Sequence, residues 1–247
     1  MHRYHNALTM LIFMLSLAII QNVNADKLLV VGLYNEGLQP FSFEPGNPKK
    51  GIYLEILDEV MKITGDKYQV QYFPYARIAK TFSQGKIDID PGNSSSWITE
   101  EAKAFSIFST PFWHYREALF SGTDNSDNDI RGKIVGTIRG YHYTGDISVA
   151  SLGYIPHQST NEKNQFKMLV GGRYDYILSG VVIAKYLSKV NGFTVKAIKN
   201  FDPTPLSFRL HSSQKDLQVR INKALDILLK DGTINRIVGK YIDSEED

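Results

Sequence analysis

The sequence predicts an α/β protein made of two units, each a mainly parallel sheet flanked by helices. Residues 27–33 (Lys-Leu-Leu-Val-Val-Gly-Leu) form a nearly continuous apolar run, which is typical of a strand buried on both faces. Residues 52–64 carry apolar side chains at helical spacing, and residues 68–73 alternate as a half-buried strand does. The same rhythm returns after residue 130, and it is typical of parallel sheets covered by helices.

The elements of the first unit follow from local signals in chain order. The first strand leads through a proline-rich loop to the helix over 52–64, which ends at Gly65. Glycine commonly terminates helices because it adopts the left-handed conformation without strain. After the strand over 68–73 we expect a short helix over 75–85 and a short strand over 87–90.

The second unit repeats the alternation after a polar run over 122–129, which predicts a linker or surface turn. A strand over 118–121 leads into that run. After it we expect strands over 133–138, 174–178 and 193–198 and helices over 161–170 and 181–190, followed by a further alternating segment over 206–210. Apolar residues over 217–229 recur at spacings of three and four and predict a long helix, and a final short helix is expected over 233–241.

The composition is that of a globular protein and excludes several kinds of site. In 247 residues, 28 Lys and Arg nearly balance 26 Asp and Glu, which argues against binding to nucleic acid. The absence of Cys excludes disulfides, thiol nucleophiles and cysteine-ligated zinc. The acidic run over 124–129 lacks the glycine and glutamate of an EF-hand loop. We therefore expect neither a metal nor another cofactor.

The first 25 residues have the layout of a secretory signal peptide. A short, weakly basic start is followed by an apolar run over 7–20 and by Val23-Asn24-Ala25, a cleavage pattern. The alternative is an uncleaved anchor, but the run is shorter than the about 20 residues that a membrane span needs. We expect an exported protein whose mature chain begins at Asp26.

A series of short motifs follows along the mature chain in a fixed order. They are Gln-Pro-Phe-Ser-Phe at 39–43, Gly-Ile-Tyr-Leu-Glu at 51–55, Gly-Lys-Ile-Asp at 85–88, Phe-Ser-Thr-Pro-Phe at 108–112, Ile-Arg-Gly-Lys-Ile-Val-Gly at 130–136, Gly-Arg-Tyr-Asp at 172–175, and the closing segment 225–242. With these motifs the chain resembles the family 3, polar amino-acid type, solute-binding proteins of bacterial ABC importers.

The resemblance implies a type II periplasmic-binding-protein fold with two lobes joined by two hinge strands. Lobe 1 would comprise residues 26–117 and 207–247, and lobe 2 residues 120–200. It further implies a periplasmic, monomeric binding protein that captures a small polar or aromatic solute and partners with the importer's permease in the inner membrane. One alternative is a ligand-sensing module that signals to a membrane partner. A less favoured one is an enzyme like cyclohexadienyl dehydratase, with His142 and Glu55 as the candidate acid or base.

Three positions depart from the family pattern for holding an amino acid. The resemblance places Ala102 where family members have the arginine that binds the α-carboxylate, a task that suits the fork of a guanidinium. It places Gly180 where an acid holds the α-ammonium, and Gly140-Tyr141-His142 where a Gly-Ser/Thr-Thr segment binds the carboxylate. We therefore expect a solute that is not held by the usual clamp.

Most candidate ligand contacts come from the family's cleft positions and carry rings or polar groups. Arg77 is added from a helix N-terminus that borders the cleft, as the replacement contact for an anion or polar group. The candidates are Phe41, Tyr75, Arg77, Ser94, Ser95, Trp97, Tyr141 and His142. A cleft of this kind suits a ring-bearing, flat or cationic ligand. Each candidate has an alternative: the aromatic rings as core packing, His142 as a surface residue, Arg77 as a partner of Glu36, Glu55 or an exposed acid, and the serines as turn residues. The other aromatic residues near the cleft, Tyr34, Tyr53, Trp113, Tyr115 and Tyr143, are interpreted as packing.

Overall fold

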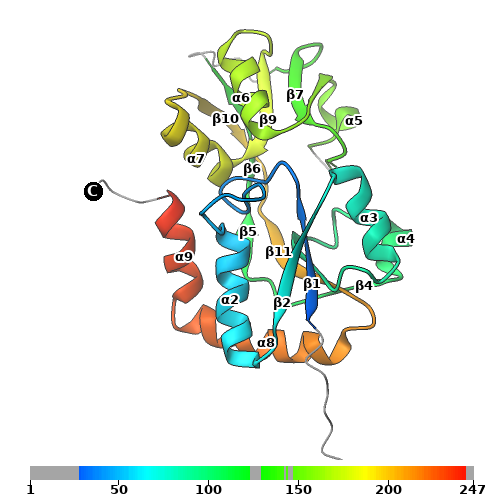
Figure 1. The fold of residues 1–247 in the computed structure, drawn as a ribbon. Coiled ribbons are helices and arrows are strands. Elements are labelled where there is room, and N and C mark those ends of the chain that lie inside the picture. The colour runs from blue at the N-terminus through cyan, green and yellow to red at the C-terminus, as the bar shows by residue number, and fades with distance from the viewer. Residues whose placement is uncertain (1–27, 123–128, 142, 144–146, 243–247) are drawn as a thin grey trace, which may run out of the picture.

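The computed structural model describes residues 28–122, 129–141, 143 and 147–242. The segment interpreted as a signal peptide therefore lies outside the described residues. Within those ranges, no helix combines the length and apolar character that crossing a bilayer requires. The chain forms two sheets, one above the other in Figure 1, and passes between them twice, from β5 to β6 and from β10 to β11.

The first sheet has the order β2-β1-β3-β11-β4, with β5 paired to the far part of β11. Its strands are β1 (Leu29–Tyr34), β2 (Tyr68–Phe73), β3 (Ile89–Asn93), β4 (Ser106–Phe108), β5 (Trp113–Tyr115) and β11 (Thr204–His211). β1 runs parallel to β2 and β3, whereas β11 runs antiparallel to β3, β4 and β5. The parallel strands end at the side that faces the second sheet (Figure 1).

The helices of this unit are α2 (Ile52–Thr64), α3 (Tyr75–Ser83), α4 (Glu100–Lys103), α8 (Lys215–Lys230) and α9 (Thr233–Ile242). The prediction of α2 is confirmed at both ends, and Gly65 caps it in the left-handed conformation with φ 77°. α2 packs against α8 and α9, so the C-terminal part of the chain returns to cover the first unit. The buried face of α8 is the one that its apolar spacing predicts, from Leu217 to Leu228.

The second sheet has the order β10-β6-β9-β7-β8. Its strands are β6 (Glu117–Ser121), β7 (Ile134–Ile138), β8 (Ile155–Ser159), β9 (Tyr176–Gly180) and β10 (Lys196–Asn200), and its helices are α5 (Val149–Leu152), α6 (Glu162–Val170) and α7 (Val181–Asn191). β7 is parallel to β8 and β9, and β6 is antiparallel to β9 and β10. The helix expected over 161–170 is α6, which begins one residue later, and Asn161 caps its start by accepting a hydrogen bond from the Asn164 amide at 2.9 Å.

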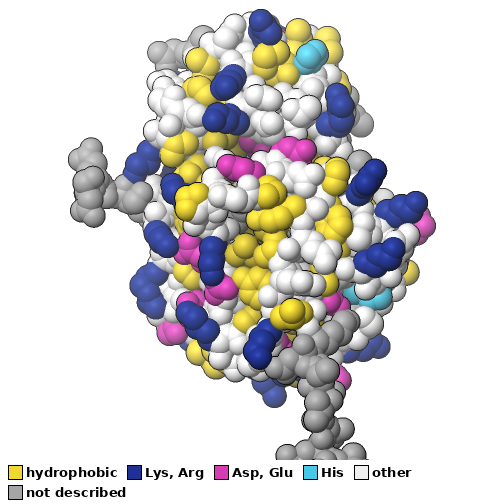
Figure 2. All heavy atoms as spheres, in the orientation of Figure 1, with side chains coloured by type: hydrophobic (Ala, Val, Ile, Leu, Met, Phe, Trp, Pro, Cys, Tyr) yellow, Lys and Arg dark blue, Asp and Glu magenta, His cyan; other side chains and the backbone are white. Residues whose placement is uncertain are grey.

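Buried residues connect the two units. The largest buried cluster contains Ile89 and Phe208 from the first sheet together with Phe120 and Ile177 from the second. On the face drawn in Figure 2, Lys and Arg side chains are scattered rather than gathered in one patch, and hydrophobic and acidic side chains lie where the two units meet. Ligands of α/β sheets bind beyond the carboxyl ends of the strands, so this junction is where a site is expected.

Candidate functional site

A cavity of about 460 Å³ lies between the two units. The first unit contributes Tyr34, Tyr53, Tyr75, Trp97 and Tyr115, and the second unit contributes Glu117, Arg139, Gly140 and Tyr141. This volume lies within the range of about 300–1,000 Å³ that small-molecule pockets occupy. The cavity therefore has the size and the position of a solute site.

A row of tyrosine rings crosses from one unit to the other along this cavity. The rings of Tyr34 and Tyr75 have centroids 4.7 Å apart, those of Tyr75 and Tyr141 5.3 Å, and those of Tyr141 and Tyr143 6.5 Å. Gly140 allows the approach, because a Cβ there would lie 2.7 Å from the Tyr75 ring. The two units thus touch through rings that also line the cavity.

The polar end of Tyr141 is fixed within the second unit. Its hydroxyl donates a hydrogen bond of 2.7 Å to the carboxylate of Glu162, which stands at the start of α6. Burial raises the pKa of both groups above their ordinary values. Tyr141 is therefore neutral, and the hydrogen bond to Glu162 fixes its ring against that of Tyr75.

A buried ion pair lies on the first-unit side of the cavity. Asp90 and Arg209 face each other on β3 and β11, with Arg209 Nη1 3.4 Å from Asp90 Oδ2. Arg209 also donates from Nε to the Ser106 hydroxyl at 2.9 Å, and its guanidinium lies 4.0 Å from the ring centroid of Phe82. Each charge is therefore offset within the protein, and both residues line the cavity.

Three of the residues predicted from the sequence line this cavity: Tyr75, Trp97 and Tyr141. The half-buried Trp97 stands edge-on to Tyr115 with ring centroids 5.5 Å apart. His142 lies outside the described residues, so its role stays a prediction.

The other predicted contacts lie elsewhere in this structure. Arg77 is exposed on α3 and does not line the cavity. Ser94 is buried in the turn after β3, where its hydroxyl bonds to that of Ser96 at 3.0 Å, and Ser95 beside it is exposed. Both serines therefore lie in a turn, which was the alternative considered for them in the sequence.

Phe41 lies behind the cavity rather than on it. Its side chain is 0% exposed, and its ring packs against Tyr53 at 5.0 Å and Tyr115 at 5.7 Å, measured between centroids. The sequence placed Phe41 in contact with ligand because family aromatics stand there. In this structure Phe41 packs on two tyrosines that line the cavity, so its contact with ligand stays a prediction.

Phe41→Leu is expected to lower the free energy of unfolding by about 1–2 kcal/mol, because it removes part of a fully packed ring. Solute affinity should change by less than about threefold, since the cavity-lining rings remain. Chemical denaturation and calorimetry measure the two quantities. Phe166→Leu, at an equally buried position of α6, is the matched control. A tenfold loss of affinity with unchanged stability would place Phe41 on the ligand instead.

Several cavity residues were not identified as contacts from the sequence. Tyr34, Tyr53 and Tyr115 were interpreted as packing, but they pack and also line the cavity. Glu117 and Arg139 were not singled out. One local feature of the sequence could have indicated Glu117: it is a charged residue directly before the apolar run Ala-Leu-Phe at 118–120.

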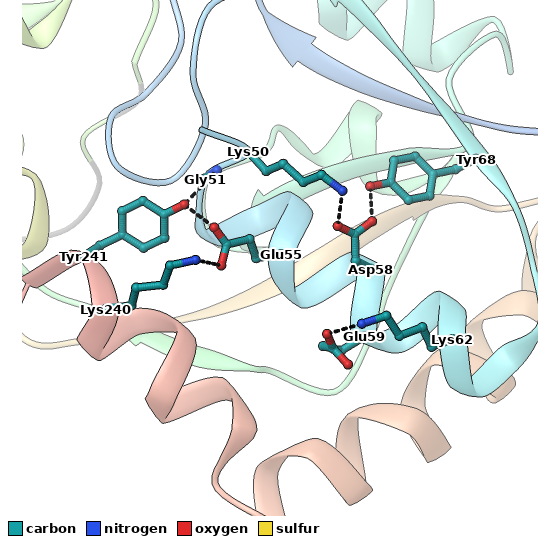
Figure 3. Close-up of polar contacts among 9 residues, drawn as sticks. All are labelled: Lys50, Gly51, Glu55, Asp58, Glu59, Lys62, Tyr68, Lys240 and Tyr241. Carbon is teal, nitrogen blue, oxygen red and sulfur yellow. Dashed lines mark hydrogen bonds and ion pairs between the residues drawn. The ribbon is translucent and has the colours of Figure 1, made fainter. Parts of the chain in front are cut away.

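Glu55 faces away from the cavity and joins two helices of the first unit. Its carboxylate accepts hydrogen bonds from the Tyr241 hydroxyl and from Lys240 Nζ, the latter at 2.9 Å, as Figure 3 shows. The same hydroxyl accepts a bond from the Gly51 amide at 3.0 Å. Glu55 therefore attaches the start of α2 to α9 and is not positioned as an acid or base in the cavity. No metal-binding cluster of three or more His, Asp or Glu occurs among the described residues.

Comparison with known proteins agrees with this architecture. A model of the bacterial extracellular solute-binding proteins, family 3, matches residues 29–244. The probable amino-acid-binding protein YxeM of Bacillus subtilis is 23% identical over 230 residues, which cover 89% of this chain and 86% of YxeM. The L-cystine-binding protein TcyJ of Escherichia coli K12 is 25% identical over 235 residues, which cover 92% and 87%.

A solved structure of an ancestral arginine-binding protein bound to arginine superposes with a TM-score of 0.72. It is 26% identical, and the match covers 86% of this chain and 97% of that one. These relatives are named as binding proteins rather than enzymes. The two-sheet architecture with its cavity at the junction is the type II periplasmic-binding-protein fold, and the chain belongs to the bacterial extracellular solute-binding proteins of family 3.

Proposed function

We propose that the protein captures a small polar or aromatic solute between its two lobes and delivers it to the permease of an ABC importer. In this proposal it acts in the periplasm, as a monomer, after removal of residues 1–25. No bond is broken, and binding shifts the balance between open and closed arrangements of the lobes. The observation that carries the proposal is the cavity at the junction, whose walls come from both lobes.

The residues that line the cavity support the proposal that the solute is not held by the arginine and the acid that bind amino acids in family members. Ala102 lines it and offers neither charge nor hydrogen bond. An acidic side chain at position 180 does not fit, because a Cβ there would overlap the Tyr115 hydroxyl. The amino-acid, cystine and arginine specificities in the names of the relatives support an amino-acid-like solute or a derivative of one.

A thermal-shift screen of the purified chain, without residues 1–25, tests this proposal. The panel contains the common amino acids, cystine, and their decarboxylated amines. A solute present at one hundred times its dissociation constant stabilises the folded state by about 2.7 kcal/mol, which raises Tm by roughly 5–10 °C in a chain of this size. Calorimetry then gives the affinity of each compound that shifts Tm.

The two tryptophans provide a matched pair of control variants for the screen. Trp97 lines the cavity, whereas Trp113 on β5 does not. We expect Trp97→Ala to abolish the shift and Trp113→Ala to keep it, whatever either change does to the starting Tm. If no compound of a broad metabolite panel stabilises the parent chain, the proposed function is wrong.

A further inference from the structure

Glu117 lies where the chain enters the second sheet, and it lines the cavity. It is the first residue of β6 and pairs in register with Gly180, the last residue of β9. Because Gly180 has no side chain, Tyr115 can lie against it. Burial and then the charge of Glu117 raise the pKa of Tyr115.

The carboxylate of Glu117 has no hydrogen-bond or ion-pair partner among the residues that the structure describes. Burial alone raises its pKa to about 7. An unpaired carboxylate in such a place is unfavourable when it is ionised, and groups of this kind are concentrated at functional sites. A positively charged ligand would supply the missing partner.

The other charges around the cavity do not compete for this role. Asp90 is already offset by Arg209 at 3.4 Å and by the Asn93 amide at 3.0 Å. Arg139 lines the cavity from an exposed position beside Gly140. Within the described part of the lining, Glu117 is therefore the acidic side chain that lacks a counter-charge.

Aromatic rings surround the space in front of this carboxylate. Tyr53, Tyr115, Trp97 and Tyr141 all line the cavity, and burial keeps the pKa of each of the three tyrosines above its ordinary value. The rings are thus neutral at physiological pH, and neutral electron-rich ring faces attract cations, the more strongly when water is excluded. A carboxylate among such rings is a combination that recognises organic cations.

We propose that the solute carries an ammonium or guanidinium group and that this group lies against Glu117, among the tyrosine and tryptophan rings of the cavity. This inference rests on the proposed function, since it specifies the class of the captured solute. It assigns charge selection to Glu117 and requires no carboxylate on the solute.

Calorimetry with matched pairs of probes tests the inference. In each pair, a neutral group of similar size replaces the cation: n-butylguanidine with n-butylurea, tyramine with tyrosol, and choline with 3,3-dimethylbutan-1-ol. We expect at least one cation to bind about 100-fold more tightly than its neutral counterpart, as for a charge paired inside a site. Glu117→Gln should remove this preference and leave the affinity of the neutral counterpart within about threefold.

Glu36→Gln is the matched control, because it removes the same charge from an exposed position outside this cavity. It should leave the preference unchanged, which separates direct contact from a general effect of net charge. The inference is overturned if the neutral probes bind as tightly as the cations, or if Glu117→Gln keeps the preference. It is also overturned if only neutral or anionic compounds from the wider screen bind, a result under which the proposed function survives. If nothing binds, both are wrong.

Discussion

Arg209→Met is expected to lower the free energy of unfolding by about 3–5 kcal/mol, because it leaves the carboxylate of Asp90 buried without its counter-charge. Both side chains are nearly fully buried, with exposures of 4% each. The change also removes the hydrogen bond to Ser106 and the contact with the Phe82 ring. Urea denaturation monitored by circular dichroism measures the loss.

A second variant shows whether the loss comes from the uncompensated charge. Asp90→Asn combined with Arg209→Met removes both charges and keeps a side chain of similar shape at position 90. We expect the double variant to regain at least half of the lost stability, since replacing both partners is far less harmful than removing one. The account of this ion pair is contradicted if the single variant stays within about 1 kcal/mol of the parent, or if the double variant is the less stable of the two.

Glu117→Gln is expected to raise the stability of the ligand-free protein by roughly 3–4 kcal/mol at pH 8 and by only about 1 kcal/mol at pH 5. The folded-state pKa of Glu117 is about 7, against about 4.3 in an unfolded chain. At a pH below both pKa values, the carboxyl is protonated in the folded and the unfolded state, so it does not change the free energy of unfolding. As pH rises through this window the unfolded chain ionises first, so the parent loses stability that the glutamine variant keeps.

The groups around Glu117 do not reproduce this pH dependence. Tyr115, Tyr143 and Tyr154 have their pKa values raised, first by burial, so they stay neutral between pH 5 and 8. Thermal melts of parent and variant at both pH values measure the difference, with Glu36→Gln as the control for net charge. If Glu117→Gln is destabilising at pH 8, the carboxylate has a partner in the folded state, and its description as unpaired is wrong.

Much of the fold could be predicted because several elements carry a complete local signal. α2 and β2 span the predicted residues. Their apolar spacing indicates a helix and a strand, and the glycine after α2 marks the end of the helix. β3 was predicted over 87–90 but spans Ile89–Asn93, because pairing with β11 extends it through Pro91 and Gly92. Local rules assign such a dipeptide to a turn, and tertiary pairing overrides them.

Other elements were not predicted at all, because their local signals are too short. β5 has three residues, and β8 (Ile-Pro-His-Gln-Ser) is exposed at four of its five positions. Neither contains enough alternation to indicate a strand.

The candidate site could be predicted only in part. Tyr75, Trp97 and Tyr141 followed from the family's cleft positions, whereas Tyr34 and Tyr53 have the same local pattern as core residues. Arg209 lies in an apolar strand, and its partner Asp90 is 119 residues away in the sequence. Glu117 enters the cavity through its pairing with β9, a contact that no local pattern shows.

The two lobes should close on a bound solute, and the distance between labels on the two lobes measures this closure. The chain contains no Cys, so Lys80→Cys on α3 and Lys167→Cys on α6 introduce unique labelling sites, both exposed. Pulsed electron paramagnetic resonance then measures the distance between spin labels without solute and with the tightest-binding compound of the screen. Solute should convert a broad distribution of label distances into a narrow one at shorter distance, and Trp97→Ala should prevent this change. An identical distribution at saturating solute would contradict closure of the lobes.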